Sequence, residues 1–280
     1  MSHQDGGMEE IEADILHNML TVLFGQTSEY IGSAIVDMPE RRRANVVRIC
    51  KIALKTLANS ISDPGEIPPR IIGQLLGPGS YVRDHVASHY WAGVLAGSRT
   101  VNPHDDRAAR WLHVLSRLGE YELRGHYLFY SSMRHHIMNT RQPAKIDFHE
   151  DRFHLATFIP AHFYIVAMNY NDDEITRMPR LISSVLYSLG QEVLVDGSNS
   201  GADHYLMQHF KSSTTGTIRG EGIVFVPSVL GVRLFLQAFG YRDADERFLL
   251  DPRFEGKIPD VPEVVQFSGL VYSGPIKREK

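Results

Sequence analysis

Apolar side chains recur every three or four positions through roughly the first half of the chain. Residues at this spacing share one face of a helix, so each periodic segment can bury an apolar stripe against its neighbours. Glycines and prolines between the segments predict short connections. We therefore expect residues 1–138 to form an array of helices, centred on 8–36, 40–58, 70–76, 81–96, 107–118 and 120–138.

The periodicity changes after residue 138. β-branched and aromatic residues around Pro160 leave both strand and helix open for 155–168, and an amphipathic helix is predicted at 175–189. Beyond it we expect a short strand, a flexible Gly-Ser-Asn-Ser-Gly loop, a helix, a mobile Ser/Thr/Gly-rich segment, a strand and a final helix capped by Ser228, at 193–195, 197–201, 202–210, 211–220, 222–227 and 229–239.

This order of elements resembles a helix-turn-helix elaborated with a β-wing. The predicted fold class is mainly α, with a helical N-terminal half followed by a winged-helix-like α+β C-terminal half. Residues 139–240 would form the winged-helix-like region. Residues 241–280 hold four prolines and little periodicity, so we expect an irregular C-terminal tail there.

Composition narrows the class of protein. A hydrophobic fraction of 43% with 22% charged residues is that of a globular chain, which excludes wholesale disorder and fibrous proteins. The net charge of −4 argues against a general polyanion binder. The longest apolar stretch, 223–239, is interrupted by Pro227, Gly231 and Arg233, so no membrane span is expected. The acidic N-terminus does not resemble a signal peptide, and we expect a cytoplasmic protein.

Motifs for catalysis are weak. His149, Glu150 and His154 could ligate a metal, but a metallohydrolase needs His-Glu-x-x-His, and a five-residue spacing splays two helical side chains by about 140°. In the Gly-Ser-Asn-Ser-Gly loop, Asn199 stands where a hydrolase elbow needs Ser. The single cysteine, Cys50, falls on an apolar stripe, which favours a buried, inert thiol. We therefore assign no catalytic residue, cofactor or metal.

One dense basic cluster stands out near the start of the predicted helix at 40–58. Positive charge there opposes the helix dipole, so another group is expected to hold it: acidic side chains of a neighbouring helix or a partner, or phosphates. A solvated charged face is the competing interpretation. The candidate partner- or phosphate-binding residues are Arg41, Arg42, Arg43 and Arg48.

The helix predicted at 175–189 would be the recognition helix of a winged helix. It offers Arg177 and Arg180 for phosphate contacts, but acidic residues flank it, at Asp172, Asp173 and Glu174. Phosphate neutralisation supplies much of the affinity for DNA, so this flank argues against a major-groove reader.

Three segments carry a family resemblance. Arg-Arg-Arg-Ala-Asn-Val-Val-Arg-Ile at 41–49, the helix pair at 81–118 around Trp91, and Val-Pro-Ser-Val-Leu-Gly-Val-Arg-Leu-Phe at 226–235 are similar to the basic helix start, central helix pair and closing helix of the Abi-alpha family, the alpha-helical abortive-infection proteins of bacteria. The resemblance implies a cytoplasmic bacterial protein connected with phage defence. It implies no catalytic residues.

The sequence thus leaves three functional hypotheses. The preferred one is a non-enzymatic anti-phage defence protein of the abortive-infection type, which acts by binding a protein partner or by self-association. The alternative is a winged-helix nucleic-acid-binding regulator that uses the wing and the arginines of the 41–48 cluster. The second alternative is a metal-dependent hydrolase that uses His149, Glu150 and His154.

Overall fold

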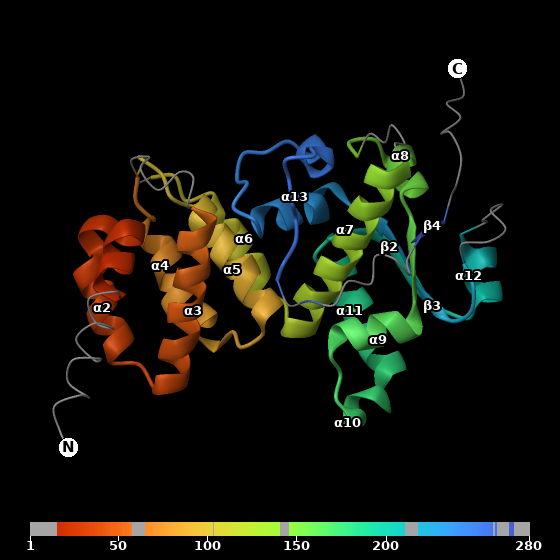
Figure 1. Cartoon of the computed structure of the whole chain (residues 1–280), viewed down its shortest axis with the longest axis horizontal. Helices are drawn as coiled ribbons and strands as arrows, with labels where there is room; N and C mark the ends of the chain where they lie inside the picture. The colour runs from red at the N-terminus through yellow and green to blue at the C-terminus, as the bar shows by residue number, and fades with distance from the viewer. Residues whose placement is uncertain are drawn as a thin grey trace. The chain divides into compact units, whose positions relative to one another are not determined.

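The computed structural model describes residues 16–57, 65–102, 104–140, 146–210, 218–259, 261 and 269–271. The chain forms two compact units, Met1–Glu120 with Gln237–Arg242, and Tyr121–Leu236 with Asp243–Lys280 (Figure 1). The described residues are mostly helical, with one small antiparallel sheet in the second unit. The predicted fold class is therefore confirmed as mainly α with an α+β C-terminal part.

Helices dominate the described part of the first unit. They are a helix at 16–24, the 3₁₀ turns η1 (Gly25–Thr27) and η2 (Pro78–Tyr81), and the α-helices α2 (Ser28–Val36), α3 (Glu40–Thr56), α4 (Pro69–Leu76), α5 (His85–Gly97) and α6 (Ala108–Arg117). The α5 helix is the core of this unit, because from Val86 to Ala96 only His89 is not fully buried. Asp84 begins it by accepting a hydrogen bond from the Ala87 N–H at 2.9 Å.

The second unit mixes helices and strands. In chain order they are α7 (Glu120–Thr140, in this unit from Tyr121 onward), α8 (His149–His154), β1 (Thr157–Pro160), α9 (Ala161–Met168), α10 (Asp172–Ile175), α11 (Met178–Gln191), β2 (Val195–Gly201), α12 (Asp203–His209), β3 (Gly222–Pro227), α13 (Val229–Gln237), η3 (Glu246–Leu250) and β4 (Gly269–Leu270). The strand order is β2-β3-β1-β4, and each adjacent pair runs antiparallel.

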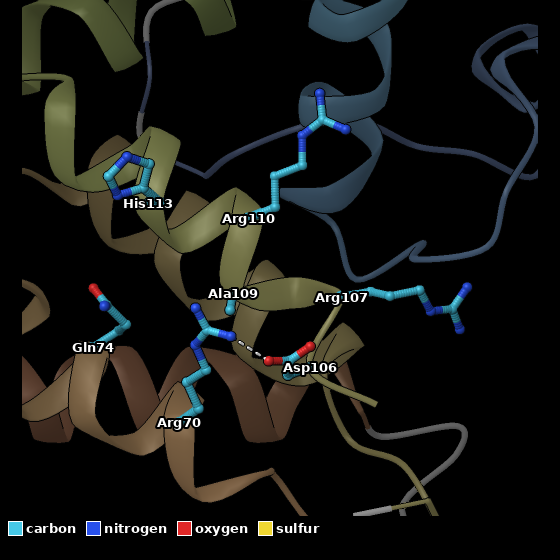
Figure 2. Close-up of a pocket in the computed structure, with 7 residues that line it drawn as sticks. All are labelled: Arg70, Gln74, Asp106, Arg107, Ala109, Arg110 and His113. Atoms are coloured by element: carbon cyan, nitrogen blue, oxygen red, sulfur yellow. Dashed lines mark hydrogen bonds and ion pairs between the residues drawn. The ribbon is translucent and has the colours of Figure 1, made fainter. Parts of the chain in front are cut away.

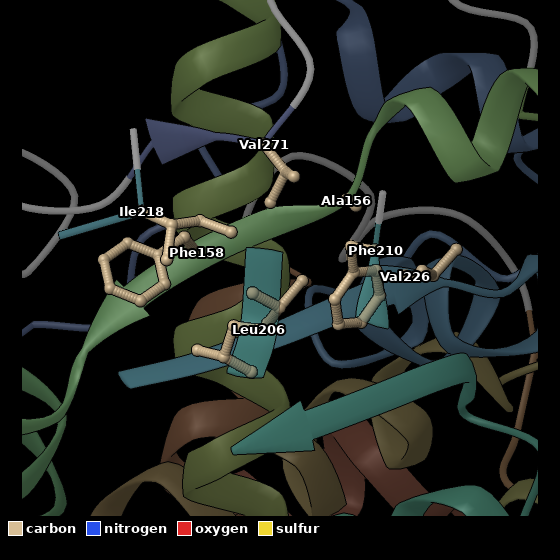
Figure 3. Packing of buried hydrophobic residues seen from close by; sticks show 8 residues of the cluster. Ala156, Phe158, Leu206, Phe210, Ile218, Val226 and Val271 are labelled. Carbon is tan, nitrogen blue, oxygen red and sulfur yellow. The ribbon is translucent and has the colours of Figure 1, made fainter. Parts of the chain in front are cut away.

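The central strand β3 is buried on both faces. Val224 and Val226 belong to a hydrophobic cluster with Leu206 of α12, and this cluster lies on one face of the sheet (Figure 3). Phe225 points to the other face, where its ring stacks on Phe129 of α7 with 4.6 Å between the ring centroids. Burial on both sides explains why 222–227 is a continuous apolar run rather than an alternating one.

Two predictions are settled by strand pairing. The expected flexible loop at 197–201 is wrong, because these residues form most of β2 and pair with β3, with Ser198 opposite Phe225. The ambiguity at 155–168 is resolved in favour of both structures: β1 ends at Pro160, and the same proline is the N-cap of α9. Proline has no N–H to continue the ladder, but its fixed φ suits the start of a helix.

The division into units and the C-terminal segment differ from the expected layout. The chain divides at Glu120 rather than at residue 138, because α7 packs against the sheet. Within 241–280, Leu249, Phe254 and Ile258 are buried, and β4 pairs with β1. Residues 8–15 of the first expected helix and 211–217 of the expected mobile segment lie outside the described residues. Among the helices described, none combines the length and apolar character that crossing a membrane requires.

Candidate functional site

Arg42 of the predicted basic cluster is bonded within its own unit. Its Nε donates to the Ser80 hydroxyl at 2.9 Å and its Nη2 to the Leu76 carbonyl at 3.1 Å. The guanidinium also lies 4.5 Å from the ring centroid of Tyr81. Arg42 therefore fastens α3 to the end of α4 and to η2, a structural role that its position in the sequence does not reveal.

Arg48 has a similar structural role further along α3. Its Nε donates to the Ser88 hydroxyl at 3.0 Å and its Nη2 to the Val82 carbonyl at 2.8 Å, which joins α3 to the start of α5. Arg41 is exposed and Arg43 is half-buried. The four arginines are thus not one cationic patch, because two of them use their donors to hold the fold together.

The histidines considered as metal ligands do not converge. His149 and His154 begin and end the six-residue helix α8, and His149 Nδ1 lies 3.4 Å from Asp196 Oδ2. Arg152 Nε lies 2.7 Å from that same oxygen, so the carboxylate already has a cation. Within the described residues, the group of three possible metal ligands that does come together excludes His149, Glu150 and His154.

That other group consists of Asp147, Asp245 and Glu246. Arginines occupy it: Arg247 Nη2 lies 3.2 Å from Asp147, and Arg233 pairs with Glu246. Guanidinium groups therefore already neutralise the carboxylates that a cation would need. The Cys50 thiol offers no nucleophile either, because burial raises its pKa to about 12.

The exposed face of α11 is the stronger candidate site in the second unit. Five residues at spacings of three, four, three and four share this face, and all are exposed: Arg177, Arg180, Ser184, Tyr187 and Gln191. We call them the α11 stripe. Fourteen residues of helix at 1.5 Å per residue give the stripe a length of about 21 Å. No acidic residue occurs in 178–191.

The sheet and α7 hold the opposite face of α11. Ile182, Val185, Leu186 and Leu189 are buried there. A Cβ added at Gly125 of α7 would lie 2.9 Å from Val185 Cγ1, so the absent side chain is what lets α7 and α11 approach closely. The helix that carries the stripe is therefore held in place by its packing against α7 and the sheet.

The acidic flank of the stripe is partly used inside the protein. Glu174 accepts hydrogen bonds from the Asn171 N–H at 2.8 Å and from the Tyr121 hydroxyl. These bonds, the Tyr121 one above all, hold the pKa of Glu174 below its usual value. Asp172 and Asp173 are exposed on the separate short helix α10. Within the described residues, no carboxylate pairs with Arg177 or Arg180.

The sequence placed a helix here but identified only its two arginines. The three-and-four spacing of Ser184, Tyr187 and Gln191 was the signal that could have completed the stripe. No family model, curated protein or solved structure matches this chain. The likeness to the Abi-alpha family stays a prediction that depends on the three quoted segments.

Proposed function

We propose that this chain is a bacterial anti-phage defence protein that acts by binding a partner, and that its second unit is a winged helix that takes duplex DNA on the α11 stripe. The defence role is supported by the Abi-alpha-like segments at 41–49, 81–118 and 226–235. The choice of nucleic acid as the partner is supported by one observation above others: an exposed helix face about 21 Å long that carries arginines and no acidic residue.

The element order favours a winged helix. After α7 the order is α8, β1, α9, α10, α11, β2, α12 and β3. Without the short helices α8, α10 and α12, this is the strand, helix pair and two further strands of a winged helix, and β3 lies between β2 and β1 in the sheet. In a helix-turn-helix the second helix is the one that enters the major groove, and here that helix is α11.

The residue types of the α11 stripe suit base and phosphate contacts. The major groove, about 12 Å wide, admits an α-helix, and arginine and glutamine pair there with guanine and adenine edges. Serine and tyrosine hydroxyls donate to phosphate oxygens. Because the chain as a whole is acidic, binding depends on these local contacts. Two arginines predict a slope of log K against log salt of about −2.

The test is a fluorescence-anisotropy titration of a labelled duplex of about 30 base pairs between 50 and 200 mM salt, a range over which phosphate contacts weaken strongly. Arg180→Ala is expected to weaken binding and to reduce the slope of log K against log salt by about 1. Arg253→Ala is the matched control, since Arg253 is an exposed arginine of the same unit off α11. Absence of binding at 50 mM salt, or equal losses in both variants, would remove the DNA assignment.

The defence role has its own test. Plaque formation by a panel of phages is compared in bacteria with the wild-type gene and its native neighbours, with the Arg180→Ala variant, and without the gene. If the wild-type gene lowers the number of plaques and the Arg180→Ala variant does not, the result supports defence through the α11 stripe. Reduced plaquing that is equally strong in the variant supports defence through another partner surface.

A further inference from the structure

The first unit carries a pocket of about 370 Å³ between α4 and α6 (Figure 2). Arg70 and Gln74 line it from α4, and Asp106, Arg110 and His113 from the turn before α6 and from α6 itself. We infer that this pocket binds the phosphate groups of a small molecule such as a nucleotide or pyrophosphate. This assignment concerns the other unit and does not depend on the proposed DNA binding.

Backbone bonding brings the two helices to the same end of the unit. Glu66 and Thr100 form a two-way β-bridge, with N···O distances of 2.9 and 3.0 Å, just ahead of α4 and α6. Ile72 and Leu75 of α4 are buried, as is Leu112 of α6, so these helices pack with their polar faces left outward. The pocket lies where those polar faces meet.

Most of the residues that line the pocket have polar side chains, and three of them are arginines. Ala109 is the one aliphatic side chain in it, whereas pockets for neutral organic ligands are lined mostly by apolar and aromatic groups. No acidic residue occurs in 107–117. Guanidinium groups bind the oxygens of phosphates and carboxylates bidentately. Three arginines against one aspartate give the lining a net positive charge, so a multiply charged phosphate suits it better than a single carboxylate does.

The arginines of the pocket differ in what they already bind. Arg107 is held by Asp105, with Nε–Oδ1 and Nη2–Oδ2 distances of 2.9 Å, and Figure 2 shows its side chain directed away from Arg70. Arg110 is exposed, and no carboxylate among the described residues pairs with it. Figure 2 shows that its side chain, like that of Arg107, is directed away from Arg70. Arg110 is therefore the guanidinium that is ready to receive an anion.

Arg70 is held across the pocket by an acidic residue. Its Nη1 lies 2.5 Å from Asp106 Oδ2, and the two side chains are 70% and 44% exposed (Figure 2). Ion pairs this exposed contribute little to stability, so a phosphate can replace the carboxylate on Arg70 with little penalty. Asp106 thus competes with the ligand for Arg70, and removal of its negative charge should strengthen anion binding.

The pattern of three substitutions tests this inference. Pyrophosphate is titrated calorimetrically into the full-length protein at about 50 mM salt, where exposed charges are weakly screened. Arg110→Ala is expected to weaken binding by about tenfold or more, since it removes charge-assisted hydrogen bonds. Asp106→Asn should tighten binding severalfold, because it removes the competing charge. Arg117→Ala, an exposed arginine of the same helix outside the pocket lining, should leave the dissociation constant within about twofold.

A second titration distinguishes a free phosphate compound from a nucleic-acid backbone. A single-stranded DNA of about 20 nucleotides, which is long enough to extend along a helix face, is titrated into the same proteins under the same conditions. Tighter binding of the DNA than of pyrophosphate, with equal losses in Arg110→Ala and Arg117→Ala, would overturn the small-molecule site in favour of an extended backbone surface. Absence of saturable pyrophosphate binding to the wild type, or tighter binding in Arg110→Ala, would also overturn it.

Discussion

Adding one methyl group at Gly231 should be among the most damaging single changes in the second unit. Gly231 lies in α13, and a Cβ there would overlap the Tyr130 hydroxyl and the Leu194 carbonyl oxygen. That hydroxyl is a hub, because it donates to the Leu194 carbonyl at 2.6 Å and accepts from the Ser228 N–H at 3.0 Å. All of these groups are buried, so no solvent can replace a lost bond.

The magnitude follows from two contributions. Forcing an extra methyl into a packed core costs about 1–3 kcal/mol. Displacing the Tyr130 hydroxyl leaves at least one buried backbone group unsatisfied, which costs about 1–3 kcal/mol more. We therefore expect Gly231→Ala to lower the free energy of unfolding by roughly 2–6 kcal/mol. Gly190→Ala is the matched control, because nothing lies within 4 Å of a Cβ at that position in α11. It should stabilise the helix by about 0.5–1 kcal/mol.

Urea unfolding followed by far-UV circular dichroism measures both variants. Both tryptophans, Trp91 and Trp111, lie in the first unit, so tryptophan fluorescence shows whether a loss extends beyond the second unit. A Gly231→Ala protein that unfolds within about 0.5 kcal/mol of the wild type would refute the overlap argument. In a Tyr130→Phe background, Gly231→Ala should cost less than it does alone, since the hydroxyl that it overlaps is gone.

Three further outcomes are expected. Arg48→Ala should destabilise the protein by about 1–3 kcal/mol because it removes the bonds between α3 and α5, whereas Arg41→Ala should stay within about 0.5 kcal/mol; urea unfolding compares them. Burial lowers the pKa of His126 from 6.5 to about 3. Between these two pH values the unfolded state binds more protons than the folded state, so the free energy of unfolding falls as the pH falls. Between pH 6.5 and 5 this loss is about 2 kcal/mol, and unfolding curves of His126→Gln should show a flatter pH dependence. Arg134→Ala should expose 249–254 to limited proteolysis, since Arg134 donates to backbone carbonyls there, and unchanged cleavage would contradict this role.

Local patterns predicted the helices well because the information for them is local. The α3 helix begins at Glu40, as the predicted range 40–58 expected, and the Ser228 hydroxyl caps α13 by accepting a hydrogen bond from the Gly231 N–H at 2.9 Å. The prediction of a loop at 197–201 was wrong for the opposite reason. Gly-Ser-Asn-Ser-Gly has the composition of a loop, and only its pairing with the apolar strand β3 makes it a strand.

The candidate sites divide in the same way. The α11 stripe lies on one helix, so its spacing is present in the sequence, although charge alone singles out only Arg177 and Arg180. The pocket joins Arg70 to Arg110 across 39 intervening residues, and no periodicity links two helices that far apart. Their meeting is a result of the packing of α4 against α6.

The sequence by itself thus determined the mainly helical class, most helix positions, and which helix faces are apolar, because these depend on neighbours within one or two turns. Only the tertiary structure decided which charged groups are available for binding. Arg42 and Arg48 form a cationic cluster along the chain, yet their donors are used by carbonyl and hydroxyl groups 34 to 40 positions away. A guanidinium's role is set by the acceptors that folding brings within about 3 Å, and sequence spacing carries no record of them.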